Sequence, residues 1–282
     1  MKIYQAYVNQ QQRNHVADCA IPLDASWNKN GNEYELFKHI KKTQLGDNDS
    51  PWGLVSWKFT GKCQIQLNEL SEFATTQFKN GCDCVFINPM IGNEALYLNV
   101  WEQGIDCGHP GLDKVGNFLA NNFDRGIKLI MSNNIFAFCN YFIATNRFWE
   151  AYFKYIDEAL ILLEREIATE SETGLAYKSS ANYKRNENLT LKPFVIERLL
   201  SPFLLKSQLK IVNYKHSPIH YQKKFGAMLG DYLLRLSITK NEAIAQNSAV
   251  QIRCYLDKRR DFLHSRYKWV MWELDDPNNL LY

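Results

Sequence analysis

Polar residues that interrupt apolar segments are the best candidates for chemistry in this sequence. In a helix predicted to start at Pro193, Glu197 and Arg198 interrupt an otherwise apolar run. Adjacent helical residues point about 100° apart, so at least one of the two charges should face inward. A carboxylate against an apolar surface can have a raised pKa and accept a proton. Alternatively, the two residues form only a structural ion pair.

Two predicted strands carry further interruptions of this kind. Asn140 lies in the apolar segment 138–145, where its amide must be hydrogen-bonded or face a cleft. The segment 83–89 begins with Asp83 and ends near Asn88. Ligands of open α/β sheets bind outside the carboxyl ends of strands, so Asn88 is expected at the binding edge and Asp83 farther away. Both residues could instead only shape turns.

Several common catalytic motifs are absent from the sequence. It contains no G-x-x-x-x-G-K-[ST], G-x-G-x-x-G, G-x-S-x-G or H-E-x-x-H motif. Phosphate-loop ATPases, dinucleotide oxidoreductases, common serine hydrolases and zincins are therefore disfavoured. The nearest acidic pairs, Asp47/Asp49 in a loop and Asp275/Asp276 at the tail, do not form a short strand-end motif of clustered oxygen ligands. No metal ligand is predicted, and dependence on Mn²⁺ or Mg²⁺ is left open.

The elements that position these residues follow from hydrophobic periodicity and turn residues. Strands are predicted over 2–8, 53–59, 83–89 and within about 127–145, and helices over 32–42, 67–78, 93–104 and 110–122. A long helix is predicted over about 146–168, a loop over 169–191, and helices from Pro193 to about 206 and through the basic end of the chain. Strand–helix alternation followed by helices predicts an α/β sheet flanked by helices, with a helical C-terminal extension.

Composition limits the class of protein. The 282 residues are 46% apolar and 22% charged, which is ordinary for a soluble globular protein. A net charge of +3 is too mild to indicate nucleic-acid binding. The 13% aromatic content fits a packed core or surfaces that stack on sugars or nucleobases. Without a signal segment, a spanning run or a disulfide framework among its seven cysteines, the chain is predicted to be cytoplasmic.

The order of the motifs resembles bacterial glycosyltransferases of capsule and lipopolysaccharide synthesis, which have a GT-A-like, nucleotide-diphospho-sugar transferase fold. The resemblance covers about residues 1–210. It depends on Tyr34-Glu35-Leu36, the strands 53–59 and 83–89, Asn140–Ile143 before an aromatic helix, Glu197–Ser201, Trp101–Gly104 and His109–Gly111. It implies a mixed central sheet in a transferase domain over 1–210, with a helical, basic extension over 211–282 packed on the same domain.

The resemblance also implies the substrates and the site. A UDP-sugar or similar donor would lie at the sheet edge, the acceptor would be a glycan or lipid-linked glycan, and no nucleic acid is expected. Glu197 would be the catalytic base or a sugar-binding carboxylate, and Asn140 would lie near the acceptor. Further substrate contacts are expected from Trp57, Lys58, Asp83, Asn88, Glu102, His109 and Arg198.

Two departures from the family concern the diphosphate. Related enzymes have a His-Tyr-Arg-Arg-type strand where this sequence has Trp57-Lys58-Phe59, and the metal-binding aspartate pair is absent. Without a metal, Lys or Arg must neutralise the diphosphate. Lys58 and Arg198 are the candidates, with His216 or His220 as alternatives. The two histidines could instead complete a metal site or pack in a loop.

Other interpretations remain open at this point. The basic, aromatic segment 253–268 could contact an anionic inner membrane, or it could be a solvated helix face diluted by Asp257 and Asp261. The chain could also be a non-catalytic carbohydrate-binding or scaffold protein on a transferase-like fold. An aromatic-rich RNA-binding protein is the third alternative, and it would show steep salt dependence of RNA affinity.

Overall fold

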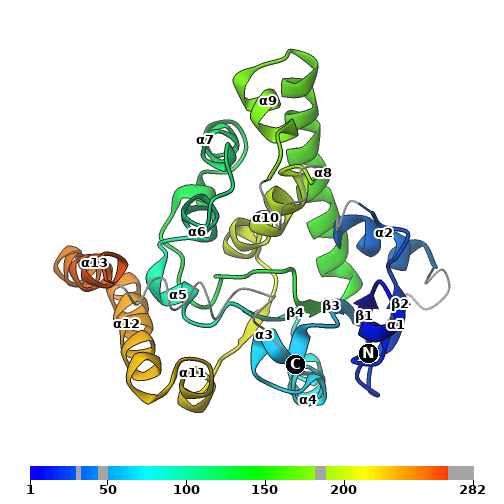
Figure 1. Ribbon diagram of the computed structural model, residues 1–282, viewed down its shortest axis with the longest axis horizontal. Helices are drawn as coiled ribbons and strands as arrows, with labels where there is room; N and C mark the ends of the chain where they lie inside the picture. The colour runs from blue at the N-terminus through cyan, green and yellow to red at the C-terminus, as the bar shows by residue number, and fades with distance from the viewer. Residues whose placement is uncertain (30–32, 44–49, 182–188, 266–282) are drawn as a thin grey trace.

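A six-stranded sheet forms the centre of the protein. The computed structural model describes residues 1–29, 33–43, 50–181 and 189–265 (Figure 1). The strands are β1 (Lys2–Tyr7), β2 (Ile21–Asp24), β3 (Trp52–Ser56), β4 (Cys84–Ile87), β5 (Phe142–Ala144) and β6 (Ile211–Tyr214), in the order β2-β1-β3-β5-β4-β6. β5 lies antiparallel between β3 and β4, and all other pairs are parallel. The predicted α/β class with a mixed sheet is confirmed.

Helices surround this sheet. They are α1 (Gln10–Arg13), α2 (Glu33–Thr43), α3 (Phe59–Cys63), α4 (Leu67–Lys79), α5 (Asn93–Leu96), α6 (Val100–Asp106), α7 (Leu112–Asn122), α8 (Asn146–Ala168), α9 (Glu172–Lys178), α10 (Lys192–Lys206), α11 (Pro218–Phe225), α12 (Ala227–Ala245) and α13 (Ala249–Leu263), with a short 3₁₀ turn η1 (Arg125–Lys128). The predicted helix over 146–168 is confirmed, and the buried residues of α8, from Phe148 to Leu163, recur at helical spacing.

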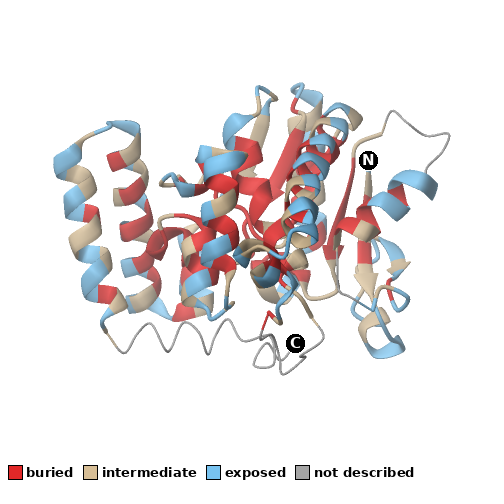
Figure 2. Ribbon diagram, turned by 90° about the horizontal axis from the view of Figure 1, so that it is seen from above, coloured by how far each residue is buried: buried red, intermediate tan, exposed pale blue. Residues whose placement is uncertain are grey.

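The two faces of the sheet bury two separate cores. Strand residues alternate between faces, so Val55, Val85 and Ile143 pack with α3 and α4, whereas Leu54 and Phe86 pack with the larger set of helices on the other side. β4 is buried on both faces, which explains its continuously apolar sequence. Figure 2 shows the burial concentrated around the sheet and decreasing toward the outer helices.

Aromatic side chains fill the larger core. Trp149 on α8 stacks on Trp52 of β3 with 3.9 Å between ring centroids and 7° between planes. Its indole Nε1 also donates to the Trp52 carbonyl oxygen at 3.1 Å. The largest fully buried side chains are all aromatic: Trp52, Trp149, Tyr34, Tyr141, Tyr152, Tyr255, Phe37, Phe59, Phe86, Phe136, Phe142 and Phe148. Core packing therefore uses much of the aromatic content noted in the sequence.

Some predicted elements differ from those observed. The single helix expected over 93–104 is two helices, because Tyr97 is extended and the Asn99 side chain caps α6 by accepting from the backbone N–H groups of Trp101 and Glu102. The segment 127–145 forms only one strand, β5, after the turn η1. Part of the expected loop over 169–191 is α9, whose first turn is capped by Ser171.

Two strands at the edges of the sheet were not predicted. β2 lies in the polar stretch 9–32 and is mostly exposed, so its sequence lacks the apolar alternation of a core strand. β6 pairs with β4, with Val85 opposite Val212, so the sheet continues past the predicted domain boundary at residue 210. The helices α11, α12 and α13 follow β6. None of the described helices is long and apolar enough to cross a membrane.

Candidate functional site

The sheet topology brings the loop before β5 to the carboxyl ends of the other strands. Because β1, β3, β4 and β6 run in one direction, their carboxyl ends share one edge of the sheet. β5 runs the opposite way, so its first residue and the preceding Asn140 lie at that same edge. Ligands of α/β sheets bind at this edge, which makes the loop the natural starting point for a site.

The loop 137–140 has an unusual backbone and is held by α10. Cys139 and Asn140 have φ values of 56° and 49°, in the left-handed region that non-glycine residues rarely adopt. Glu197 Oε1 accepts from the Cys139 backbone N–H at 2.6 Å, and Ser201 Oγ accepts from the Ala137 N–H at 2.9 Å. Glu197 and Ser201 are four residues apart and so share one helix face. The two hydrogen bonds made by this face hold the strained loop against α10.

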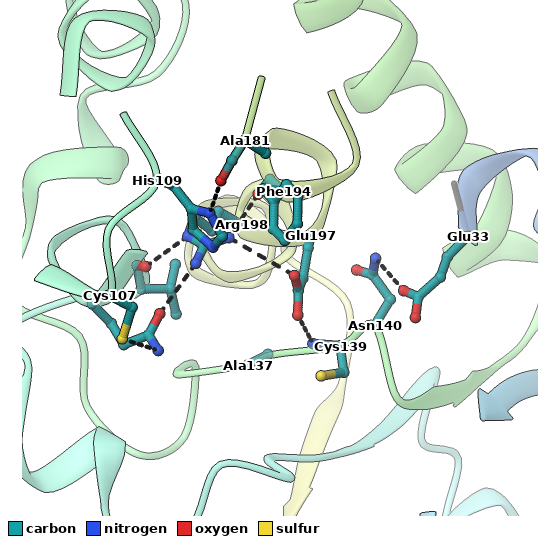
Figure 3. A network of polar contacts seen from close by, with 12 residues as sticks. Glu33, Cys107, His109, Ala137, Cys139, Asn140, Ala181, Phe194, Glu197 and Arg198 are labelled. Carbon is teal, nitrogen blue, oxygen red and sulfur yellow. Dashed lines mark hydrogen bonds and ion pairs between the residues drawn. The ribbon is translucent and has the colours of Figure 1, made fainter. Parts of the chain in front are cut away.

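Asn140 links three elements through its carboxamide. Its Nδ2 donates to Glu33 Oε2 at 3.1 Å, at the first residue of α2. Its Oδ1 accepts from the Tyr152 hydroxyl of α8 at 3.2 Å. The side chain is buried, and its orientation is fixed because Nδ2 donates one hydrogen bond and Oδ1 accepts another. Figure 3 shows Asn140 between Glu33 on one side and Glu197 on the other.

The electrostatics of this group are set by two carboxylates and one lysine. Burial and the nearby charge of Glu197 raise the pKa of Glu33 from 4.5 to about 8, against opposing contributions from Lys62 and the Asn140 hydrogen bond. Lys62 on α3 donates to Cys139 Sγ at 3.3 Å. Glu197 keeps a partly exposed side chain, at 19%. Glu33, Lys62, Cys139, Asn140 and Glu197 are called the sheet-edge cluster below.

The cluster confirms the closeness of Asn140 and Glu197 that the sequence predicted, and adds residues that were missed. Glu33 and Lys62 were not identified as site residues. An acidic residue in the first turn of a helix is usually explained by its favourable interaction with the helix dipole. Nothing in the sequence therefore marked Glu33 as a site residue. Lys62 lies in α3, a short helix in a region to which the sequence analysis assigned no element, and only the fold brings it to the loop.

Trp57 and Lys58 also lie at the carboxyl edge, directly after β3. The Trp57 ring packs beside His15 with 5.7 Å between centroids, and Lys58 Nζ lies 5.1 Å from the Trp57 ring centroid. Both side chains are only partly buried. The Ser56 hydroxyl hydrogen-bonds the Tyr141 hydroxyl, which ties the end of β3 to the loop that carries Asn140. These two predicted residues therefore border the sheet-edge cluster.

Arg198 and His109 lie behind the cluster and serve packing. Arg198 is buried and donates to the carbonyl oxygens of Val100 and Phe194 and to Gln103 Oε1, at 3.0 to 3.1 Å. Its guanidinium holds α6 and α10 together, and Nη1 lies 3.8 Å from Glu197 Oε2, which is the ion pair that the sequence left open. The sequence had also suggested Arg198 as a cation for a diphosphate, but all of these contacts are within the protein. His109 Nδ1 lies 2.9 Å from the Ala181 carbonyl oxygen (Figure 3). Burial and Arg198 lower the pKa of this histidine.

Three further predicted contact residues lie apart from the cluster. Asp83 is at the opposite edge of the sheet, where Oδ2 accepts from the Lys210 backbone N–H at 3.0 Å. Asn88 does end β4 at the binding edge, but it is buried and donates to Glu94 Oε2 at 3.0 Å. Glu102 pairs with Arg259 and so holds α13 against α6. The contacts of these three residues join parts of the protein to one another, and none of them reaches the sheet-edge cluster.

The two histidines after β6 are also committed. His216 Nε2 lies 2.8 Å from the Asn88 carbonyl oxygen, and burial lowers the pKa of this imidazole to about 4. His220 forms a capping box with Ser217 at the start of α11. Within residues 1–29, 33–43, 50–181 and 189–265, no group of three or more His, Cys, Asp or Glu is placed to hold a metal ion. The acidic pairs Asp47/Asp49 and Asp275/Asp276 lie outside the described residues.

No family model, curated protein or solved structure matches this chain. The class of protein is therefore defined by its own geometry. It is an α/β protein in which two glutamates, an asparagine and a lysine meet at the carboxyl edge of a mixed sheet.

Proposed function

We propose that the protein is a glycosyltransferase that moves a sugar from a nucleotide-diphospho-sugar, with a UDP-sugar as the first candidate, to a glycan acceptor of a bacterial surface polysaccharide or lipopolysaccharide. The observation that carries the proposal is the meeting of Glu33, Asn140 and Glu197 at the carboxyl edge of the sheet. This agrees with the resemblance noted in the sequence, in which the regions of Asn140 and Glu197 belong to one site.

Each member of the cluster has a role in the proposed transfer. Glu197 has a partly exposed carboxylate and is the proton acceptor for the hydroxyl group of the acceptor. Lys62 takes the place of Arg198 as the cation that neutralises the diphosphate. Its amine lies beside Cys139, in the loop that carries Asn140. Asn140 fixes the distance between α2, α8 and the loop, so that the reacting groups are held in place before substrate arrives.

Glu33 carries a proton at neutral pH in this proposal, because its pKa is raised to about 8. The protonated carboxyl can donate a hydrogen bond to a sugar hydroxyl or a phosphate oxygen. It also reduces the negative charge near Glu197, which would otherwise repel a diphosphate. Of the two carboxyl groups, Glu33 thereby donates a hydrogen bond and Glu197 accepts a proton.

The aromatic residues at the end of β3 support a nucleotide as the donor. Trp57 and His15 present partly exposed rings at the carboxyl edge, next to the Ser56–Tyr141 contact. Rings of this kind stack on nucleobases and on the apolar faces of sugars. Lys58, over the Trp57 ring, adds positive charge at the same place.

The test is a ligand screen followed by turnover measurements. Thermal shift with UDP-, GDP-, CMP- and TDP-sugars, each with and without Mn²⁺, identifies the donor and its metal requirement. Glu197→Gln should then lower the rate of sugar transfer about 100-fold or more while the melting temperature stays close to that of the wild type. Glu35→Gln is the matched control, because Glu35 is on α2 but pairs outward with Lys38. Near-normal transfer by Glu197→Gln would remove Glu197 from the mechanism, and no shift with any donor would contradict the proposed substrate class.

A non-catalytic carbohydrate-binding protein is the second candidate. It is favoured by one observation, namely that Glu197 and Asn140 already use their polar atoms to hold the loop. In that case a sugar nucleotide would bind and raise the melting temperature, but neither transfer nor hydrolysis would be detected with the wild-type protein.

A further inference from the structure

Trp27 and His39 form an exposed pair of aromatic rings at one end of the sheet. Trp27 is 50% exposed, whereas three other tryptophans are at most 2% exposed. His39 is exposed as well, and the centroids of the two rings are 5.3 Å apart with 51° between the ring planes. An exposed pair of rings in contact with each other marks a candidate interaction surface. Trp27 and His39 are called the aromatic platform below.

The turn that carries Trp27 is held by hydrogen bonds. The indole Nε1 of Trp27 donates to the Asp24 carbonyl oxygen at 3.1 Å, and the Asp24 carboxylate accepts from the Ser26 backbone N–H at 2.9 Å. The Ala25 backbone N–H donates to the Tyr7 carbonyl oxygen at 2.8 Å, which attaches the turn to the end of β1. The indole ring is therefore oriented before any ligand arrives, and binding on it would cost little conformational entropy.

The aromatic platform is connected to the edge of the sheet that carries the sheet-edge cluster. β2 is parallel to β1 and β3, so Asp24 ends β2 at the carboxyl edge, and Trp27 follows in the next turn. His39 lies on α2, whose first residue is Glu33 of the sheet-edge cluster. His39 comes six residues after Glu33, which corresponds to about 9 Å along a helix. An extended ligand on the platform can therefore follow α2 to the cluster.

The charged groups around the platform are of both signs. The charged residues of the turn and those nearest to His39 along α2 are Asp24, Lys29, Glu35, Lys38 and Lys42. Glu35 pairs with Lys38 at 2.8 Å, and hydrogen bonds from Ser26 lower the pKa of Asp24, whose carboxylate is exposed. An anionic bilayer or a nucleic acid would require positive charge alone. Mixed charges beside exposed rings suit a ligand that has many hydroxyl groups and apolar ring faces.

We propose that the aromatic platform binds a glycan chain and holds the part of the acceptor that lies outside the reaction centre. The apolar faces of sugar rings stack on the indole and imidazole rings, and sugar hydroxyl groups donate to the Asp24 carboxylate and accept from Lys42. A protein partner fits less well, because the core of a protein interface is depleted of charged residues. The role as an acceptor site depends on the proposed function, whereas glycan binding itself also fits a non-catalytic carbohydrate-binding protein.

The experiment is binding of the full chain to an array of immobilised bacterial surface polysaccharides, dextran and galactomannan, without any nucleotide. Wild type should bind at least one of these glycans, and binding should persist at high NaCl, because ring stacking is not screened by salt. Trp27→Ala should lower the affinity for that glycan about tenfold, since one aromatic stacking contact contributes a free energy of that order. Trp27→Phe should recover part of the affinity because it keeps an aromatic face, and His39→Ala should cause a smaller loss than Trp27→Ala.

A matched aromatic control keeps the result specific to the platform. Tyr232 is 38% exposed and stacks on Phe262, and its helix α12 lies at the other side of the molecule from α2 (Figure 1), so Tyr232→Ala should bind glycan like wild type. Wild-type affinity in Trp27→Ala, loss of wild-type binding at high NaCl, or no binding of wild type to any glycan of the array would overturn the proposal. Binding of sugar nucleotides is measured without glycan, so the proposed function and the aromatic platform fail separately. Glycan binding that requires Trp27 without binding of any sugar nucleotide would support the platform in a non-catalytic protein.

Discussion

Two clusters in this protein have similar composition but different access to solvent. In the sheet-edge cluster, Glu33 accepts from Asn140 Nδ2 at 3.1 Å. Behind it, Glu94 accepts from Asn88 Nδ2 at 3.0 Å. Burial is the main cause that raises the pKa of both carboxyl groups, and each cluster contains a lysine. The interior cluster consists of Asn88, Glu94, Tyr221 and Lys240.

The difference lies in how the polar groups are used. Lys240 is fully buried, and its amine donates to the carbonyl oxygens of Glu94 and Tyr97 at 2.8 and 2.6 Å. Tyr221 donates to the Glu94 carboxylate, so the interior cluster is enclosed and attaches α11 and α12 to α5. The sheet-edge cluster keeps Glu197 partly exposed and lies beside a left-handed loop. Exposure and backbone strain, rather than residue type, distinguish the candidate site from a structural cluster.

The largest effect is expected from Lys240→Ala in the interior cluster. The substitution leaves the buried carbonyl oxygens of Glu94 and Tyr97 without their amine partner, which should cost about 3 kcal/mol of the free energy of unfolding. Donor affinity should change little. Urea denaturation and isothermal titration with the donor measure the two quantities.

An exposed lysine on the neighbouring helix is the control for this variant. Lys258→Ala on α13 should change the free energy of unfolding by less than about 0.5 kcal/mol. If Lys240→Ala lowered donor affinity and spared stability, the division between a structural cluster and a candidate site would be wrong.

The sequence indicated the parts of the fold that local pattern determines. Periodicity was sufficient for α8 and α4. The apolar run interrupted by two charges was sufficient for α10, where Arg198 is buried and Glu197 is partly exposed. The edge strands β2 and β6 were missed, since their residues are only partly buried and depend on pairing with a distant strand.

The candidate site could be predicted only in part for the same reason. Asn140 and Glu197 stood out because a polar residue in an apolar segment is informative without any knowledge of its partners. Glu33 and Lys62 did not, because their significance depends on contacts with residues 107 and 77 positions away in the chain. Asp83 and Glu102 looked similar to site residues by type, and only the sheet direction and the position of α13 separate them from the cluster.

A smaller effect is expected from Lys62→Ala in the sheet-edge cluster. If Lys62 neutralises the diphosphate, the dissociation constant for a nucleoside diphosphate should rise about tenfold, and that for the nucleoside should change little. Lys62→Arg should recover part of the affinity because it keeps the positive charge. Lys58→Ala is the comparison, since Lys58 was the sequence-based candidate. Equal losses for the nucleoside and the nucleoside diphosphate would show that Lys62 only supports the loop.

The smallest effect is a change in how stability depends on pH in Glu33→Gln. The pKa of Glu33 rises from 4.5 to about 8 on folding, so the protonated carboxyl favours the folded state. This stabilisation is complete below about pH 4.5 and is lost as the pH rises through about 8. The free energy of unfolding of the wild type should therefore fall over this range, relative to Glu33→Gln. Urea denaturation at several pH values measures the difference, and Glu35→Gln should follow the wild type. Parallel curves for wild type and Glu33→Gln would mean that Glu33 is ionised in the folded protein, and the sheet-edge cluster would then lack the proton that separates donor from acceptor.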